Sequence, residues 1–473
     1  MPASVIERLY RAIPIHRLRG IDRWTIVRLG VVAGAVVAAV LAVRAFGRSY
    51  IFFDLRIYHG AVAWWWSGDG LYEYVAPDVT LGFTYPPFAA IVMLPMAAMP
   101  IGAAGVLNAI ASLTALAVVL AALLVPIADR CGWPRWFAVA LALPLAAATE
   151  PVRETIGYGQ VNLLLFGLVM ADLVALRWRF ESAGHPVAGP LLRRLWRQGA
   201  WAGVGIGLAS AIKLTPALFI CYLLLTRQWR PALTAIGTAA GVTIGAFLVA
   251  SRESLLYFTS VIWQTERVGA ADMTPNQSLA GVLARLYDSP DAPGLMWLAF
   301  AMLMLAVGLS RAATAHAEGD ELAAFTLVGL TSNVISPISW SHHLAFVLPA
   351  IIVLADTARR RRAASRGLSR RRLGHGLATP RMLSLAGLRH ASAALGVYVL
   401  FVVSPIWAYE HKLPKMSHYA DGMLGVLAEN SLALALIMMV AAMPWRPGAE
   451  PAFSAEPTLR VANRRLLAPS PVR

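Results

Sequence analysis

Hydrophobic residues are gathered into long runs separated by short polar segments, and this pattern predicts a membrane protein built from helices. The first run, residues 25–47, is about 23 residues long and would reach about 34 Å as a helix, enough to cross a hydrocarbon core of about 30 Å. It follows a basic arm, residues 1–24, and lacks the short apolar stretch and small-residue cleavage site of a secretory signal peptide, so we expect an uncleaved signal anchor. Eleven further runs bring the number of candidate spans to twelve: 101–127, 136–149, 161–176, 200–212, 214–226, 231–250, 294–310, 322–338, 343–357, 391–409 and 425–443.

The apolar run 86–100 is ambiguous because Pro86–Pro87 and Pro100 bracket it. We interpret it as a re-entrant or interfacial helix, since counting it as a span would invert every later one. With both termini cytoplasmic, 30 of the 41 Lys and Arg residues lie in cytoplasmic segments and 9 lie on the opposite side, as the positive-inside rule requires. The chain then reads as one transmembrane domain, 25–443, with an extracytoplasmic loop at 48–100, a basic cytoplasmic loop at 358–389 and a cytoplasmic tail at 444–473.

Composition supports a membrane location, since 58% of the residues are hydrophobic and only 14% are charged, against about 25% charged in a soluble domain. The net charge of +16 would suit nucleic acid, but the arginine runs 359–362 and 370–372 lie in a predicted cytoplasmic loop. We assign them to topology and to contact with anionic lipid, and we predict no nucleic-acid role. Dense clusters of polar residues occur only on the opposite side, so function is predicted to face outward. No nucleotide-binding motif is present, and we predict no cofactor.

Asp54 directly follows the first span and is flanked by aromatic residues at the outer membrane boundary. A carboxylate there is costly, so it needs a reason. One interpretation is a general base, because partial burial raises a carboxyl pKa and strengthens the base. The other is a helix N-cap for an interfacial helix running to Trp66. That helix carries Tyr58 and a Trp64–Trp66 cluster, which suits either a membrane-interface belt or a platform for sugar rings.

A second cluster spans residues 150–162 and ends in Gln160 and Asn162. Amides suit hydroxyl-rich ligands because each both donates and accepts. The alternative is a loop held together by its own side chains. Tyr85 precedes Pro86–Pro87, which predict a rigid turn into the re-entrant element.

Lys213 stands alone between two apolar runs of about 13 residues, which is expensive unless it meets water or an anion. We predict that it holds a phosphate; snorkelling to the interface is disfavoured by the apolar flanks. The segment 336–343 ends in His342 and His343, for which a metal, a phosphate or sugar contact, and helix capping are the interpretations. Zinc needs three or four ligands and adjacent histidines diverge on a helix, so we predict no metal.

In order along the chain, these segments resemble glycosyltransferase family 87, the actinobacterial membrane α-1,2-mannosyltransferases that use polyprenyl-phosphate-mannose and have the GT-C fold. The matching positions are Asp54-Leu55 with Tyr58, Leu71-Tyr72, Tyr85-Pro86-Pro87-Phe88, Gly159-Gln160-Val161-Asn162, Lys213 with Pro216, Asn276-Gln277-Ser278-Leu279, and Ser336 through His343.

The resemblance implies an all-α polytopic enzyme of the cell membrane with its active site on the extracytoplasmic side. It implies transfer of mannose from polyprenyl-phosphate-mannose to the 2-hydroxyl of a mannosylated lipid (a phosphatidylinositol mannoside, lipomannan or lipoarabinomannan), with inversion. Asp54 would be the catalytic base, and Lys213 and His342 would stabilise the departing phosphate. The remaining expected contacts are His343, Gln160 and Asn162 for the donor and Tyr58, Tyr85, Trp340, Asn276 and Gln277 for the acceptor or sugar.

Two alternatives remain at this point. A related activity transfers arabinofuranose from decaprenyl phosphate, and no residue excludes that donor. A transporter or flippase of lipid-linked sugar belongs to another class, but it predicts inverted repeats and broken helices at the bilayer centre, and the sequence has no repeat.

Overall fold

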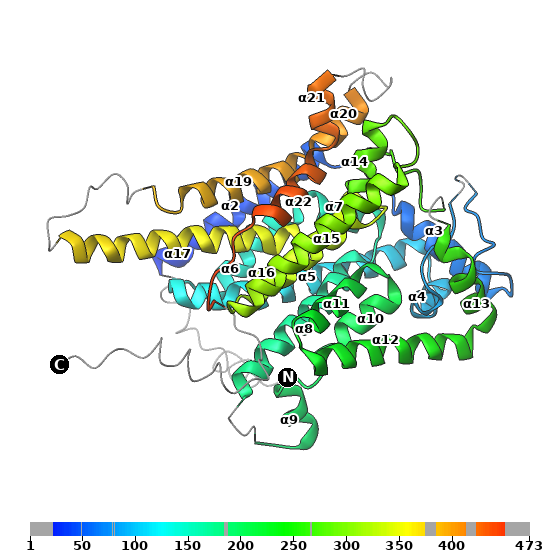
Figure 1. Cartoon of the computed structure of the whole chain (residues 1–473), viewed down its shortest axis with the longest axis horizontal. Helices are drawn as coiled ribbons and strands as arrows, with labels where there is room; N and C mark the ends of the chain where they lie inside the picture. Colours follow the sequence, from blue (N-terminus) through cyan, green and yellow to red (C-terminus); the bar gives the residue numbers. More distant parts are fainter. Residues whose placement is uncertain are drawn as a thin grey trace, which may run out of the picture.

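A computed structural model shows a bundle of helices lying side by side along the long axis of the molecule (Figure 1). It describes residues 22–48, 50–77, 79, 81–183, 188–264, 267–373, 385–412 and 422–449. Within these ranges there is no strand, only one isolated bridge between Asn276 and Trp340. The predicted all-α class is therefore confirmed. The N-terminal arm up to residue 21 and most of the predicted tail lie outside the described residues.

Five of the helices in the described part of the chain are long and apolar enough to cross a membrane, which supports a membrane protein. They are α2 (Arg23–Phe46), α5 (Ile101–Cys131), α12 (Trp229–Val249), α15 (Gly294–Ala317) and the stretch Leu388–Trp407, which contains α19 (Leu388–Val403). A sixth span results if α21 (Gly422–Glu429) and α22 (Ser431–Ala442), bent by 65°, are taken as one. The count of twelve stays a prediction.

Several other predicted spans form shorter helices, as the lengths of their apolar runs imply. They are α6 (Arg135–Ala147), α10 (Val204–Ile212), α11 (Leu218–Leu225) and α16 (Glu321–Ile335), whereas α8 (Asn162–Ser182) is longer. Such short elements persist in a membrane where neighbouring protein shields their ends.

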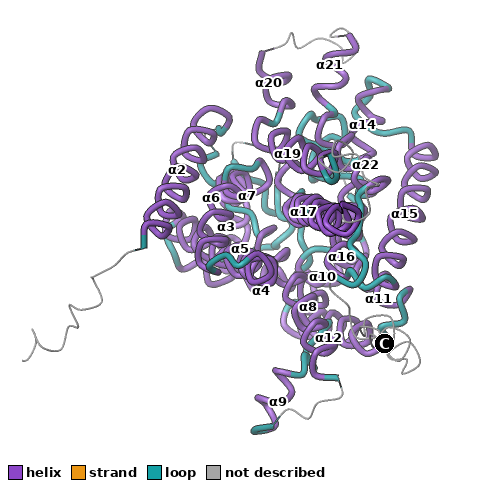
Figure 2. Tube along the Cα trace, turned by 90° about the vertical axis from the view of Figure 1, so that its left-hand side faces the viewer, coloured by secondary structure: helices purple, strands orange, loops and turns teal. Residues whose placement is uncertain are grey.

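Burial separates the helices that face the surroundings from those at the centre. Only 11% of the apolar window of α2 is buried, and a helix that is apolar on all sides and uncovered by protein suits contact with lipid. In contrast, every residue of α16 from Glu321 to Val334 is buried. Figure 2 shows α17 (Val347–Leu373) end-on near the middle of the bundle, with α2 and α15 on opposite flanks.

Short helices gather at one end of the bundle, on the right in Figure 1, and carry the predicted site. They include α3 (Phe53–Trp66), α4 (Pro87–Met93) with the 3-10 turn η2 (Leu94–Ala98), and α13 (Ser251–Thr259). A separate aromatic core, built around Tyr58, Tyr72, Phe83, Tyr85 and Tyr257, joins them. α4 and η2 together form a short apolar helix, and the re-entrant or interfacial interpretation of residues 86–100 stays a prediction.

Two predicted loops are helical over part of their length, and residues 374–384 of the basic loop lie outside the described residues. Residues 150–158 form α7 (Glu150–Tyr158), because Pro151 fits the first turn of a helix and Gly159 ends it at φ 73°. The basic segment from residue 358 continues α17 as far as Leu373. Arginine favours helix, and Asp356 accepts hydrogen bonds from Arg359 and Arg360 one turn later.

Candidate active site

A cavity of about 220 Å³ opens at the end of the bundle where the short helices meet. Its walls come from α3, the turn before α4, the turn after α7, the break after α10 and the segment 336–343. Seven of the predicted site residues line it: Asp54, Tyr58, Tyr85, Gln160, Lys213, Trp340 and His343. The fold therefore brings together side chains that lie almost 290 residues apart in the sequence.

Asp54 lies in the first turn of α3, and it is not the N-cap. The N-cap is Phe52, whose φ of 52° is unusual for a residue with a side chain. Two contacts hold this turn: the Phe52 main-chain N–H donates to the carbonyl of Gly157 at 3.0 Å, and its ring packs against Gly105, where a Cβ would come within 2.5 Å of the ring. The capping interpretation of Asp54 is therefore wrong, and its carboxylate is free to serve the cavity.

Burial raises the pKa of Asp54 to about 6, although a hydrogen bond from Gln160 and the charge of Lys213 act in the opposite direction. The carboxyl is thus ionised at neutral pH and is more basic than an exposed aspartate. Both properties are what a general base at neutral pH needs.

The side-chain amide of Gln160 is held in one orientation by two tyrosines. Tyr85 donates to its Oε1 at 2.9 Å, so its Nε2 must be the end that donates to Asp54 Oδ2 at 2.9 Å and to the Tyr58 hydroxyl at 2.8 Å. Tyr58 in turn donates to the Tyr85 hydroxyl at 3.1 Å. These four side chains form a closed network that fixes the carboxylate, which the sequence alone did not reveal.

Lys213 occupies the break between α10 and the 3-10 turn η3 (Thr215–Ala217), where its backbone is extended. Its Nζ donates to Asn162 Oδ1 at 3.1 Å, lies 2.9 Å from His343 Nε2 and is 5.4 Å from the centroid of the Tyr85 ring. It forms no ion pair with any carboxylate of the described residues. Burial lowers the pKa of Lys213 to about 7, although the charge of Asp54 opposes this. An anion entering the cavity would favour its charged form.

The ring of His343 lies between the main-chain N–H of Trp340 and the amine of Lys213. The main-chain N–H of Trp340 donates to Nδ1 at 3.2 Å, so in a neutral ring the hydrogen belongs on Nε2, which faces Lys213. That hydrogen can be accepted only by an uncharged amine. The geometry therefore fits an uncharged Lys213–His343 pair that gains a proton when an anion binds. The contact with Trp340 also caps the 3-10 turn η6 (Ser341–His343), so the capping interpretation is correct for His343, while its contact with a ligand stays a prediction.

Three other predicted site residues are buried and do not line the cavity: His342, Asn276 and Gln277. The His342 ring is buried against Tyr158, at 5.3 Å between ring centroids, and its Nε2 has no partner among the described residues. Asn276 and Gln277 are wholly buried. Their amides bond to main-chain groups, Asn276 to Ala271, Pro337 and Ser339 and Gln277 to Thr274, Glu429 and Ala433.

The acids and Arg of the 150–162 cluster hold the structure together. Glu154 accepts hydrogen bonds from Ser341 Oγ and Arg48, and Glu150 accepts from Arg153 and Trp407. These contacts tie α7 to η6, to α20 (Pro405–Lys412) and to the end of α2. The alternative of a segment held by its own side chains is thus correct for the acids, while Gln160 and Asn162 face the functional residues.

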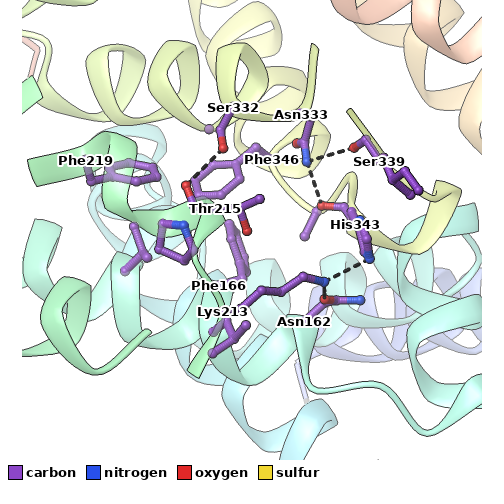
Figure 3. Close-up of a pocket in the computed structure, with 16 residues that line it drawn as sticks. Asn162, Phe166, Lys213, Thr215, Phe219, Ser332, Asn333, Ser339, His343 and Phe346 are labelled. Carbon is purple, nitrogen blue, oxygen red and sulfur yellow. Dashed lines mark hydrogen bonds between the residues drawn. The ribbon is translucent and has the colours of Figure 1, made fainter. Parts of the chain in front are cut away.

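A smaller, mainly apolar cavity of about 60 Å³ lies directly beside Lys213. Figure 3 shows Lys213, Asn162 and His343 on one side and the rings of Phe166, Phe219 and Phe346 on the other. Lys213 and His343 line both cavities, so a ligand could place an anionic group between a polar and an apolar chamber.

Sequence reasoning missed Arg267 and Tyr257, which also line the larger cavity. Neither belongs to a motif or to a periodic segment that could have singled it out. In the part of the chain that the structure describes, no three His, Cys, Asp or Glu side chains come together as a metal site needs.

Comparison with known proteins places these features in a family. The model of glycosyltransferase family 87 matches residues 83–337, a stretch that contains Tyr85, Gln160, Asn162 and Lys213 but begins after Asp54. A polyprenol-phosphate-mannose-dependent alpha-(1-2)-phosphatidylinositol mannoside mannosyltransferase of Mycobacterium tuberculosis is 33% identical over 352 residues, covering 71% of this chain and 77% of that protein.

A second M. tuberculosis relative is a polyprenol-phosphate-mannose-dependent alpha-(1-2)-phosphatidylinositol pentamannoside mannosyltransferase. It is 32% identical over 321 residues, covering 67% of this chain and 69% of its own length. The crystal structure of ArnT from Cupriavidus metallidurans bound to undecaprenyl phosphate aligns with 89% of this chain and 77% of its own, but with 15% identity and a TM-score of 0.35, too low to indicate a shared fold. The family model and the identity with the mycobacterial enzymes agree with the order of the motifs: the chain belongs to glycosyltransferase family 87, a family of glycosyltransferases.

Proposed function

We propose that this chain is an inverting α-1,2-mannosyltransferase of the GT-C fold. Its donor is polyprenyl-phosphate-mannose, and its acceptor is the 2-hydroxyl of a mannosylated lipid: a phosphatidylinositol mannoside, lipomannan or lipoarabinomannan. The observation that carries this proposal is that a carboxylate, Asp54, and a lysine with no ion-pair partner among the described residues, Lys213, line the same cavity. The names of the mycobacterial relatives support the choice of mannose and of the lipid acceptor.

In the proposed reaction Asp54 takes the proton from the acceptor 2-hydroxyl as its oxygen attacks the anomeric carbon. The bond from that carbon to the phosphate oxygen breaks at the same time, and its electron pair stays on the phosphate. A β-linked donor thus gives an α-linked product in one displacement, with polyprenyl phosphate as the leaving group. Asp54 suits this role because its pKa of about 6 leaves it ionised at neutral pH and still basic enough to take the proton.

Lys213 supplies the positive charge for the leaving group. The phosphate gains a negative charge as the bond breaks, and a cation fixed in a water-poor site stabilises that charge more than it would in water. Asn162 and His343 hold the amine in place. Tyr58, Tyr85 and Trp340 remain the proposed sugar contacts because they line the cavity, whereas Asn276, Gln277 and His342 take the role of shaping its wall.

The smaller cavity supports the proposal that the donor is linked to a lipid. Phe166, Phe219 and Phe346 offer an apolar surface for the first carbons of the isoprenoid, while the phosphate stays at Lys213 and the mannose extends toward Asp54. We place the enzyme in the cell membrane with about twelve spans, this site on the extracytoplasmic side and the basic segments on anionic lipid at the cytoplasmic face.

The test is transfer by membranes that contain the chain, supplied separately with labelled polyprenyl-phospho-mannose and with the corresponding arabinose donor. We expect label in glycolipid from the mannose donor alone, and a loss of about 10²- to 10⁴-fold in the Asp54→Asn variant, which keeps the size of the side chain but removes the base. Transfer from the arabinose donor alone would refute the choice of sugar. An Asn variant with the parental rate would refute the role of Asp54.

A further inference from the structure

Arg267 is a second cation in the larger cavity, and neither the motifs nor the comparisons assign it a role. It lies in the loop between η4 (Val261–Trp263) and α14 (Leu279–Leu286) and lines the cavity together with Asp54 and Lys213. Its Nη2 donates to the main-chain carbonyl of Tyr72 at 2.8 Å, and its Nη1 lies 3.5 Å from Gln264 Oε1. These contacts fix the guanidinium in place.

The guanidinium of Arg267 has an N–H group without an acceptor and a positive charge without a counter-ion among the described residues. Its Nε is buried and has no hydrogen-bond partner among the described residues, and none of their carboxylates forms an ion pair with it. Three other arginines at this end are paired with carboxylates: Arg48 with Glu154, Arg153 with Glu150 and Arg252 with Glu73. Arg56, which forms no ion pair among the described residues, is exposed to the surroundings. A half-buried cation without a counter-ion costs free energy until an anion arrives, so the cavity is prepared for an anion at this point.

The position of Arg267 favours the acceptor over the donor as the source of that anion. Lys213 and His343 line both cavities, whereas Arg267 lines only the larger one. A donor with its phosphate at Lys213 and its isoprenoid in the apolar cavity leaves the rest of the larger cavity to the acceptor. Gly82 lies beside the guanidinium: a Cβ there would come within 2.4 Å of the Tyr74 carbonyl oxygen and 3.3 Å of Nη2.

We propose that Arg267 binds the phosphodiester of the acceptor lipid, and that it thereby selects mannosylated phosphoinositides over neutral mannosides. This proposal rests on the proposed function. A planar guanidinium pairs with phosphate through two parallel hydrogen bonds, which is stronger and more specific than a contact with a sugar hydroxyl. The contact also favours acceptors in which few sugars separate the phosphate from the attacked hydroxyl, because both must fit in one cavity.

The test measures the KM of the purified full-length enzyme for three substrates: polyprenyl-phospho-mannose, a phosphatidylinositol mannoside, and an alkyl α-mannoside that lacks phosphate. For Arg267→Gln we expect the KM for the phosphoinositide to rise about 10- to 100-fold. The KM values for the donor and the alkyl mannoside should stay within about twofold of the parental values. Arg267→Lys keeps the charge but loses the two parallel hydrogen bonds. Its KM for the phosphoinositide should lie between those of the parent and of Arg267→Gln.

Arg252→Gln is the matched control, because Arg252 lies on the exposed side of α13, paired with Glu73 and outside the cavity. It should change none of the three KM values. An independent readout uses the unmodified enzyme and so does not depend on how well a variant folds. Raising the salt concentration should weaken binding of the phosphoinositide more than binding of the alkyl mannoside.

Three results would overturn the proposal. A rise confined to the donor KM would assign Arg267 to the donor phosphate. An equal rise for both acceptors would assign it to sugar hydroxyls, and unchanged values for both Arg267 variants would show that it contacts no ligand. Failure of the proposed function is distinct, since the unmodified enzyme would then transfer no mannose to either acceptor.

Discussion

The hydrogen bond from Gln160 to Asp54 predicts how the pH dependence of transfer responds to a single substitution. Gln160→Met keeps the length of the side chain and removes the amide that donates to Oδ2 at 2.9 Å. The bond favours the charged carboxylate, so its loss raises the pKa of Asp54 above its value of about 6. The perturbation thus acts on the base without touching the base itself.

The magnitude follows from the strength of a hydrogen bond to a charged group, about 1.5–3 kcal/mol. Since one pKa unit corresponds to about 1.4 kcal/mol, the pKa should rise by about 1 to 2 units. Activity needs the ionised base, so it is present above the pKa and lost as the pH falls through it. At pH 7 the ionised fraction falls from about nine-tenths to between about a half and a tenth.

The assay is kcat/KM for mannose transfer between pH 5 and 8.5, with label counted in the glycolipid product. The acidic limb of the variant should move upward by about 1 to 2 units, while the basic limb, at which Lys213 with its pKa of about 7 loses its proton, should stay in place. Tyr58 and Tyr85 also lose their partner, so a lower melting temperature should accompany the shift.

Asn108→Ala provides the control because Asn108 donates to the main-chain carbonyl of Gln160 at 3.2 Å and leaves the amide alone. Its acidic limb should coincide with that of the unmodified enzyme. If the limb of the folded Gln160→Met enzyme also stays in place, then Asp54 is not the group whose ionisation governs transfer, and the reasoning fails.

Three further outcomes follow from the structure. Lys213→Met should lower kcat/KM by about 10²- to 10³-fold through loss of charge at the leaving group without lowering the melting temperature, because it removes a buried amine; a lower melting temperature with unchanged kinetics would contradict this. Gly159→Ala should impair both folding and activity, since φ is 73° and a Cβ would lie 2.5 Å from Leu55 Cβ. Gly34→Ala is the control, because a Cβ there would meet nothing within 4 Å. It should behave as the parent in thermal melts and transfer assays. Asp172→Ala should lower stability by about 1–2 kcal/mol, because its carboxylate accepts from two main-chain N–H groups at the start of α10; parental unfolding of the purified variant would refute that role.

The sequence predicted which distant residues lie close together because each polar segment of a membrane protein can lie on only one of two sides. Charge asymmetry predicts one side for each polar segment, so Asp54, Lys213 and His342 were expected together although none is near another in sequence. Of the two adjacent histidines, His343 lines the cavity and His342 does not. The helix ending at Trp66 was also predictable, since its aromatic and apolar positions recur at helical spacing. These predictions need the order of the spans but no detail of packing.

The direction of a side chain on irregular backbone was not predictable. Asn276, Gln277 and His342 belong to the same motifs as the cavity residues, yet their side chains do not line the cavity. An irregular segment or a single 3-10 turn is too short for a periodicity that would separate its two sides. The helix α7 was hidden for a related reason: Pro151 and Gly157 suggest a loop, although a proline is compatible with the first helical turn.

These observations explain why the motifs of this chain are rich in amides. The working residues lie at helix ends and breaks: Asp54 at the start of α3, Gln160 after α7, Lys213 after α10 and His343 in η6. Breaks expose main-chain N–H and C=O groups that lipid cannot satisfy. Asn276 satisfies such groups just before η6, and Gln277 does so at the break between α21 and α22. Asn162 satisfies the His342 carbonyl while also holding the lysine. A membrane enzyme that needs polar groups at its breaks must therefore carry a second set of polar residues to make those breaks possible.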